Sequence, residues 1–167
     1  VVVTDPAGKI TFWNTYAGKI YGWQSEEVLG RFIFDITVPE DQRDYSKTIM
    51  QQLRDGEAWS GEFWVKRKDG QPFLAHVINQ PLYDADGQQI GVIGLSDDVT
   101  EARKEIKRQH DNEQLLSGIL RAIPNFIYVY DFVEDRNVFT NSALTMILGY
   151  TPEDLQAMGA NAIPKLV

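Results

Sequence analysis

Asn79 is the residue whose surroundings most suggest a binding site. It follows Ala75 and Val77 at intervals of two in a β-rich run, so all three side chains would point to one side of a strand. An amide among apolar residues can hold a small apolar or aromatic ligand. The alternative is a filled core in which the amide bonds to the backbone. The expected pocket residues are Trp59, Phe63, Val65, Ala75, Val77, Asn79 and Ser96.

A second candidate site is the polar pair Asp98 and Thr100, which lies where the last β-rich run meets a long helical stretch. Thr100 is suited to cap the start of that helix. Asp98 would bond the backbone or a basic side chain such as Arg67 or Lys68. We expect this pair to act as a signal exit that ties the sheet to the orientation of the helix. The alternative is a simple helix cap.

The sequence contains no recognisable catalytic or metal-binding motif. The sequence has no cysteine, and no nucleophile triad, phosphate loop or catalytic pair of carboxylates stands in a convincing context. Residues 84–87 begin like a calcium loop, but Leu95 occupies the twelfth position, where glutamate is required. His76 should face away from the pocket and His110 falls in the helical stretch. We expect neither an enzyme nor a metal site.

The composition indicates a folded, acidic protein. The 167 residues are 43% hydrophobic and 24% charged, and 16 Lys and Arg against 24 Asp and Glu give a net charge of −8. That sign disfavours a nucleic-acid partner. Because no signal peptide or membrane span is recognisable, we expect a cytoplasmic segment without membrane contact. Both ends suggest a piece of a longer protein.

Periodicity and turn residues predict the elements that position these side chains. Strands at 1–4 and 10–13 form a hairpin, helices follow at 14–21, 25–29 and 41–53, and strands at 60–66, 73–82 and 90–96 are joined by hairpin turns. This order predicts an antiparallel α+β domain.

The side of the strands opposite Asn79 is also apolar. An antiparallel sheet packed on one side only should alternate apolar and polar residues. Because these strands do not, we expect the linker helix, a partner subunit or a second copy of the domain to cover this outer face. The outer-face interface candidates are Trp64, Leu74, Ile78, Ile93 and Leu95.

An internal repeat sets the domain boundaries. Residues 14–29 align without gaps with residues 141–156. Residues 101–124 between the copies predict a helix with a heptad seam, either a parallel two-helix connector or a solvated linker. We therefore expect a domain at 1–100, a helical linker at 101–124 and the N-terminal part of a second domain at 125–167. The seam residues are Ala102, Ile106, Gln109, Glu113, Leu116, Leu120 and Ile123.

Several motifs together resemble the PAS family of sensory domains. They are DPAGKITFWN at 5–14, YGWQSEEVLG at 21–30, VPED at 38–41, WSGEF at 59–63, RKDG at 67–70 and DVTE at 98–101. The resemblance spans residues 1–101 and begins again near Phe126. It implies a PAS fold, a five-stranded antiparallel sheet with small helices on one face around a pocket, here followed by a long linker helix and the start of a second PAS domain.

The resemblance also bears on cofactors. In light-oxygen-voltage relatives a cysteine forms the flavin adduct, and two asparagines and a glutamine contact the flavin. Here Ile33 stands at the cysteine position, and Val65, Ala75 and Ser96 stand at the other three. Helix 41–53 has no histidine for haem. We therefore predict no cofactor, and leave open an unknown small ligand or noncovalent flavin.

These features predict a sensory or signal-relay module. It would couple ligand or dimer state through the linker to a downstream effector in the same chain, in a sensor histidine kinase. The alternatives are a cofactor-free dimerisation scaffold or a noncovalent-flavin redox sensor, in a cyclic-di-GMP enzyme or another multidomain regulator. We expect a homodimer formed through the outer face and the linker helix. The segment itself would not be an enzyme, although the full-length protein would be a histidine kinase or diguanylate cyclase.

Overall fold

The structure is a computed structural model that describes residues 1–125, 127–131, 133–134, 136–141 and 149. It divides into two compact units, Val1–Lys104 and Glu105–Val167. The predicted second copy beyond residue 141, apart from Gly149, lies outside the described residues.

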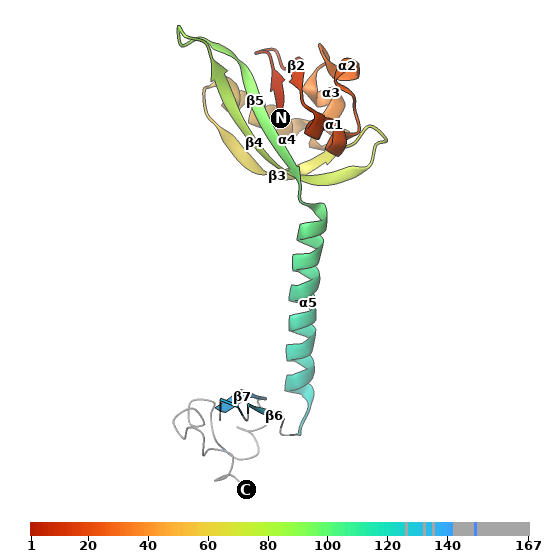
Figure 1. Ribbon diagram of the computed structural model, residues 1–167, viewed down its shortest axis with the longest axis vertical. Helices are drawn as coiled ribbons and strands as arrows, with labels where there is room; N and C mark the ends of the chain where they lie inside the picture. Colours follow the sequence, from red (N-terminus) through yellow and green to blue (C-terminus); the bar gives the residue numbers. More distant parts are fainter. Residues whose placement is uncertain (126, 132, 135, 142–148, 150–167) are drawn as a thin grey trace. The chain divides into compact units, whose positions relative to one another are not determined.

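The first unit is built on a five-stranded antiparallel sheet in the order β2-β1-β5-β4-β3 (Figure 1). Its strands are β1 (Val2–Thr4), β2 (Ile10–Trp13), β3 (Trp59–Lys66), β4 (Pro72–Tyr83) and β5 (Gln89–Asp98). Pairing of β1 with β5 joins the N-terminal hairpin to the three long strands. The predicted antiparallel α+β architecture is confirmed.

Short helices connect β2 with β3 and cover one face of the sheet (Figure 1). They are α1 (Thr15–Tyr21), α2 (Ser25–Val28), α3 (Ile33–Thr37), the 3-10 helix η1 (Glu40–Gln42) and α4 (Arg43–Arg54). The three predicted helices are confirmed with small changes at their ends. Helix α3 was not expected, because its β-branched and aromatic residues are poor helix formers. Its Ile36 is fully buried, so tertiary packing holds this turn.

Local hydrogen bonds explain where the first helices begin and end. The Asn14 side chain accepts a hydrogen bond from the Ala17 amide at 2.8 Å and so caps the start of α1. Gly22 ends α1 with a φ of 77°, a left-handed conformation that favours glycine. Gln24 and Glu27 form a reciprocal capping box at the start of α2.

Two clusters of buried apolar side chains join the helices to the sheet. The larger connects the strands with α1, α2 and α3, and the smaller joins α4 to Val92 of β5. Phe73, Ile10 and Leu53 are among the largest fully buried side chains. Burying a side chain of this size stabilises the fold by about 1.5–3 kcal/mol.

Strand register assigns each side chain to one face of the sheet. On the helix-covered face Val65 pairs with Phe73. On the outer face Trp64 pairs with Leu74, and Ile78 pairs with Leu95. The faces predicted from the period of two are therefore confirmed for these strands.

Helix α5 (Thr100–Ala122) follows β5 and continues into the second unit. None of its side chains is buried. The helix stops two residues before Pro124, which lacks the backbone donor that a helix needs. No helix within the described ranges is long and apolar enough to cross a membrane.

In the second unit, α5 is followed by a hairpin that repeats the first one. Its strands are β6 (Tyr128–Asp131) and β7 (Arg136–Thr140). Val129 pairs with Phe139 as Val3 pairs with Phe12, and in both hairpins the register shifts directly after that pair. The segments directly before the two aligned sequences therefore share strand pairing and the same register shift.

Gly91 lies at the closest approach of β1 to β5. A Cβ atom added there would lie 2.0 Å from the Thr4 carbonyl oxygen, far inside a van der Waals contact. Any side chain at this position would push the two strands apart. Only glycine lets the N-terminal hairpin join the sheet at this point.

We predict that Gly91→Ala lowers the free energy of unfolding of the first unit by about 1–3 kcal/mol, the usual cost of overpacking. Chemical denaturation followed by tryptophan fluorescence measures the effect. Gly118→Ala is the control, since no atom lies within 4 Å of a Cβ there and alanine favours the helix. Equal stability of Gly91→Ala and the wild type would contradict the close approach.

Candidate functional site

A cavity of about 80 Å³ lies between the helices and the inner face of the sheet. Its sheet side includes side chains from β1, β3, β4 and β5, and its helix side comes from α3, α4 and the end of α1. Most of the lining is apolar. The lining residues are Val2, Thr4, Tyr21, Ile33, Phe34, Thr37, Val38, Ser46, Ile49, Met50, Leu53, Phe63, Val65, Val77, Asn79, Val92, Gly94 and Ser96.

Five of the seven predicted pocket residues line this cavity: Phe63, Val65, Val77, Asn79 and Ser96. Trp59 and Ala75 are not among the lining residues.

The two exceptions have different causes. The Trp59 ring folds back over Gly61, where a Cβ would lie 2.9 Å from it, and packs edge-on against Phe63 and Tyr45. The Ala75 methyl group is completely buried within the core. Strand periodicity predicts on which side of the sheet a side chain lies, but it does not predict whether that side chain reaches the cavity.

The helix side of the lining was missed by sequence reasoning. Ile49, Met50 and Leu53 of α4 line the cavity from the apolar face of this helix. Tyr45 falls on the same face by its spacing of four from Ile49, but it is 48% exposed. The amphipathic spacing of α4 was therefore the signal available, although it does not show which of these residues meet a cavity.

Asn79 carries an amide without a hydrogen-bond partner among the described residues. It pairs across the strands with Gly94. A Cβ at Gly94 would lie 2.6 Å from the Asn79 Oδ1 atom. The missing side chain of Gly94 therefore provides the space in which the amide lies, and the predicted alternative of a backbone-bonded amide is not observed.

Tyr21 is the only side chain of the lining that can ionise. Its hydroxyl and the Ser96 hydroxyl are hydrogen-bonded at 3.1 Å. Burial raises the pKa of Tyr21 to about 12, against the opposing effects of Ser96 and the positive charge of Arg67. The cavity is therefore uncharged at neutral pH.

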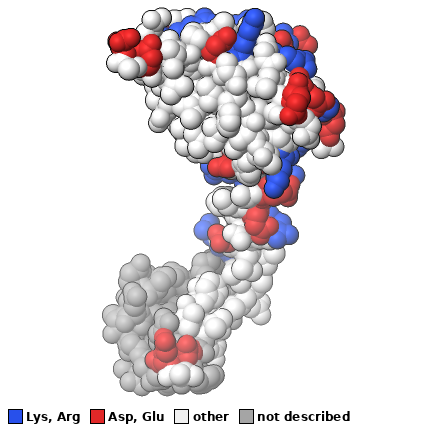
Figure 2. Space-filling model, turned by 45° about the horizontal axis from the view of Figure 1, so that its top comes forward, with Lys and Arg blue, Asp and Glu red and all other residues white. Residues whose placement is uncertain are grey.

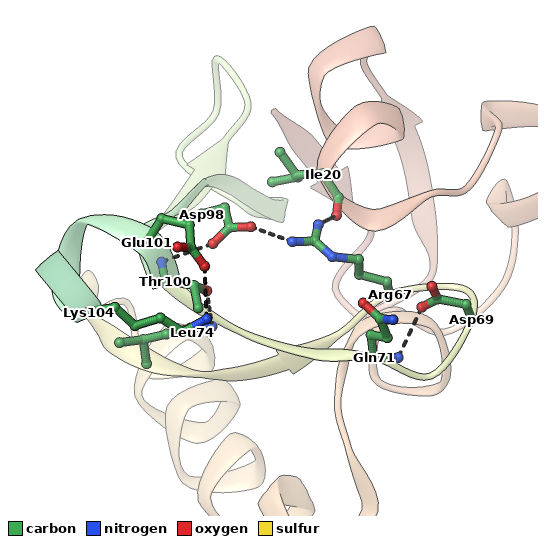
Figure 3. Close-up of polar contacts among 9 residues, drawn as sticks. All are labelled: Ile20, Arg67, Asp69, Gln71, Leu74, Asp98, Thr100, Glu101 and Lys104. Carbon is green, nitrogen blue, oxygen red and sulfur yellow. Dashed lines mark hydrogen bonds and ion pairs between the residues drawn. The ribbon is translucent and has the colours of Figure 1, made fainter.

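The end of β5 is tied to the rest of the unit by Arg67 (Figure 3). Its guanidinium donates hydrogen bonds to the Asp98 carboxylate and to the Ile20 carbonyl at the end of α1. It also lies 4.1 Å from the centre of the Phe73 ring. The expected contact between Asp98 and Arg67 is thus present, whereas its role in signalling stays a prediction.

Thr100 does not cap α5 with its side chain, which corrects the sequence prediction. The Asp98 carboxylate accepts the Thr100 amide hydrogen at 3.0 Å, and the Thr100 hydroxyl oxygen accepts the Leu74 amide hydrogen at 2.9 Å (Figure 3). Val99 also donates to the Leu74 carbonyl at 3.0 Å. Because this bond continues the pairing beyond β5, the hydroxyl lies against β4 instead of the helix end.

The charge of Asp98 is stabilised by these contacts. Burial alone would raise the pKa of Asp98, but the hydrogen bonds from Thr100 and the nearby Arg67 outweigh it and hold the pKa below its usual value. Asp98 is thus a carboxylate at neutral pH. The acidic form would lose the ion pair.

The outer face of the sheet remains exposed in the first unit. Trp64 is 46% exposed, Leu95 45% and Ile78 36%. Leu74 and Ile93 are half-buried. Figure 2 shows charged side chains along the rim of this unit and around the start of α5, with broad areas between them that carry none.

An asparagine closes each hairpin in the same way: Asn14 is half-buried and Asn141 is buried. The Asn14 backbone amide donates a hydrogen bond to the Val1 carbonyl, and the Asn14 side-chain oxygen accepts one from the Val1 amino group. Asn141 makes the same two bonds with Ile127 at 3.1 and 3.0 Å. The Asn141 Nδ2 atom also donates to the Leu120 carbonyl in the last turn of α5, at 3.2 Å.

Metal chemistry has no candidate group in the described part of the chain. Asp84, the first residue of the calcium-like sequence, accepts hydrogen bonds from the Asp86 and Gln88 amides and so closes a turn. His76 pairs with Glu62 and Asp97 on the outer face, as its position predicted. His110 is exposed on α5.

Comparison with known proteins gives related signalling proteins. Two-component system protein A of Emericella nidulans is 36% identical over 108 residues, which cover 63% of this chain and 15% of that protein. The probable diguanylate cyclase DgcE of Escherichia coli is 32% identical over 111 residues, which cover 65% of this chain and 10% of that protein. The chain therefore spans less than a sixth of the length of these two relatives.

Solved structures and a family model agree on the first unit. A PAS domain from Colwellia psychrerythraea superposes with a TM-score of 0.55 at 28% identity, covering 60% of this chain and 85% of that one. The family model described as PAS domain matches residues 1–101, well over half of the sequence. Together with the five-stranded sheet, its helical cover and the cavity between them, this match shows that the chain belongs to the PAS domain family.

Proposed function

We propose that the chain is a sensory and signal-relay module that passes the state of its cavity, or of a dimer, to an effector through α5. The observation that carries this proposal is the junction of Asp98 and Thr100 with Arg67 and Leu74. One short segment there bonds the sheet and the start of α5 at once. A displacement of β5 would therefore change the direction of the helix.

The cavity is connected to this junction by direct contacts. Tyr21 lines the cavity, bonds Ser96 two residues before Asp98, and meets the Phe73 ring at 5.3 Å between ring centres. Phe73 in turn lies under the Arg67 guanidinium. A ligand that moved Tyr21 or Ser96 would shift the population of junction geometries.

We propose that the effector, in the same full-length chain, is a histidine kinase of a two-component system. The likeness to Two-component system protein A supports that choice. The likeness to DgcE makes a diguanylate cyclase the second candidate. Both classes consume a nucleoside triphosphate, so either effector would place the module in the cytoplasm.

We also propose that a second PAS domain begins in the second unit. The shared register of the two hairpins and the matching roles of Asn14 and Asn141 support this. The module would then consist of a sensor at 1–100, a helical linker at 101–124 and the start of a second sensor at 125–167. Helix α5 would carry the signal from one sensor to the next.

The cavity favours a sensor without a large cofactor. Its volume of about 80 Å³ is below the roughly 300–1,000 Å³ of pockets for drug-sized ligands. Ile33, Val65 and Ser96 line it in place of the adduct cysteine and two of the flavin-contacting residues of light-oxygen-voltage relatives. A noncovalent flavin would lack amide partners at these positions. An absorption spectrum of the purified protein tests this.

We further propose a homodimer through the outer face of the sheet and α5. Ile78 and Leu95 form an exposed cross-strand pair, and the exposed Trp64 lies on the same face, where it pairs with Leu74. On α5, Ile106, Leu116 and Leu120 recur on the predicted seam, and the first two are more than half exposed. Burial of both surfaces against a second copy would remove apolar area from water. A cofactor-free scaffold would use the same surfaces.

The first test removes one hydrogen bond of the junction, from the Leu74 amide to the Thr100 hydroxyl. Thr100→Val keeps the shape of the side chain but removes the acceptor for the Leu74 amide, whereas Thr100→Ser retains it. We predict that Thr100→Val lowers the free energy of unfolding by about 1 kcal/mol and speeds hydrogen exchange of the Leu74 amide. In the full-length protein it should uncouple the output from the stimulus, while Thr100→Ser should behave as the wild type. Normal regulation in Thr100→Val and in Asp98→Ala would contradict the proposal.

The second test uses pH. Because the pKa of Asp98 is lowered in the folded state, its stabilisation should be complete above about pH 4, the ordinary aspartate pKa, and should vanish as pH falls through the lowered value. We predict that chemical denaturation between pH 2 and pH 7 shows a loss of stability at acid pH that is smaller in Asp98→Asn. Asp86→Asn, in the β4–β5 turn, is the control and should follow the wild type. Parallel curves for Asp98→Asn and the wild type would argue against the ionic junction.

The third test addresses the dimer. We predict that Trp64→Arg combined with Leu95→Arg shifts the protein to a monomer in sedimentation velocity, because two charges would enter an apolar interface. Leu29→Arg is the control, since Leu29 is similarly exposed, at 48%, but lies at the end of α2. An unchanged mass of the double variant would exclude the outer face as the interface.

A further inference from the structure

We propose that the cavity takes a small, uncharged ligand with a hydrogen-bonding head group, and that the Asn79 amide recognises this head group. The inference rests on the proposed sensory function, because it takes the cavity as the place where a ligand acts. It goes further by stating which chemistry is accepted and which is refused. Four features of the cavity lead to it.

The first feature is the difference between Asn79 and the polar groups on the helix side of the cavity. The Thr37 hydroxyl donates to the Ile33 carbonyl at 3.0 Å, and the Ser46 hydroxyl donates to the Arg43 carbonyl at 2.8 Å. Their donors are therefore used within their own helices. The Asn79 amide, with two donors and an acceptor, has no such bond to any described residue.

The second feature is the hollow that receives the amide. Asn79 pairs with Gly94, and the register places Val2 on the other side of Gly94 in the same row of the sheet. Any side chain at Gly94 would collide with the Asn79 Oδ1 atom. Glycine thus leaves space in the floor of the cavity, and the Asn79 amide lies in that space.

The third feature is a second polar group within reach. Ser96 lies two residues from Gly94 on β5 and so occupies the diagonal position to Asn79, a separation of about 7–8 Å at the backbone. The Ser96 hydroxyl accepts the Tyr21 hydrogen bond, so its own hydrogen stays available. A head group with both a donor and an acceptor would fit between Asn79 and Ser96.

The fourth feature is the absence of charge in the lining. None of its residues is acidic or basic, and Tyr21 is neutral because its pKa is about 12. Arg67 is occupied by Asp98 and Ile20. An anionic or cationic ligand would lose its hydration without a counter-charge, which costs far more than burying a neutral group. The cavity should therefore select against ions.

Size limits the ligand further. An engineered cavity of about 150 Å³ binds benzene, whereas this one measures about 80 Å³. A molecule with a few non-hydrogen atoms, such as a short-chain amide, fits that space. Small ligands of this kind bind weakly, so we expect dissociation constants in the millimolar range.

The test compares two probes of the same shape, propionamide and propionate, on the whole chain at pH 7 and constant ionic strength. Thermal denaturation and calorimetry measure binding. We expect propionamide to raise the melting temperature with concentration and propionate to bind at least tenfold more weakly. In ¹⁵N-labelled protein the side-chain NH₂ resonances of Asn79 should shift with propionamide.

Asn79→Leu removes the amide at nearly constant volume. We expect this variant to melt no lower than the wild type, because it loses a polar group without an internal partner, and to bind propionamide at least tenfold more weakly. Gln80→Leu is the control, since the neighbouring side chain faces away from the cavity; its binding should match the wild type. If Asn79→Leu does not fold, the Asn79 resonance in the wild type decides.

Three results would overturn the inference. They are no binding of propionamide up to 100 mM, equal binding of both probes, and unaltered binding in Asn79→Leu. The first would leave water as the only partner of the amide. The effects of the Thr100 and Asp98 variants on the junction are measured without a ligand, so they do not depend on these results. A wrong ligand class and a wrong relay function can therefore be told apart.

Discussion

The guanidinium of Arg67 is the constraint on which the first unit depends. A partly buried cation needs charged and polar partners around it, and its partners come from three parts of the chain. They are the Ile20 carbonyl at the end of α1, the Asp98 carboxylate at the end of β5 and the Phe73 ring of β4. Satisfying one side chain therefore fixes the relative positions of a helix, the sheet and the start of α5.

The same constraint makes the cavity and the junction mechanically related. Phe73 is fully buried and contacts both Tyr21 and Arg67. On the side away from the cavity Tyr21 packs against Phe73, so a movement of Tyr21 in that direction would displace the Phe73 ring. The junction is easier to deform than the buried core around Phe73, because Asp98 and Thr100 are held only by hydrogen bonds and one ion pair. Displacement should therefore appear at α5 and not in the core.

Sequence reasoning reached the sheet more fully than the site. A period of two assigned Val65, Val77 and Asn79 to the inner face because strand geometry leaves no other choice. Trp59 also packs against the inner-face core, but its ring turns over Gly61 and does not line the cavity, a detail that periodicity does not contain. Thr100 was expected to cap the helix because threonine is a common capping residue. The backbone hydrogen bond from Val99 to Leu74 extends the strand pairing, and it places the Thr100 hydroxyl against β4. Such details follow from tertiary contacts, which no local pattern contains.

The repeat extends from sequence to hydrogen bonding, and this bears on how a relay would work. Asn14 and Asn141 close their hairpins with the same pair of bonds, so the local sequence is sufficient to form this corner in both units. Asn141 has a further task, since its Nδ2 atom holds the Leu120 carbonyl of α5. A helix carries a rotation only if each end is bonded to the structure it moves. Asp98 and Thr100 provide this bond at the start of α5, and Asn141 provides it at the end.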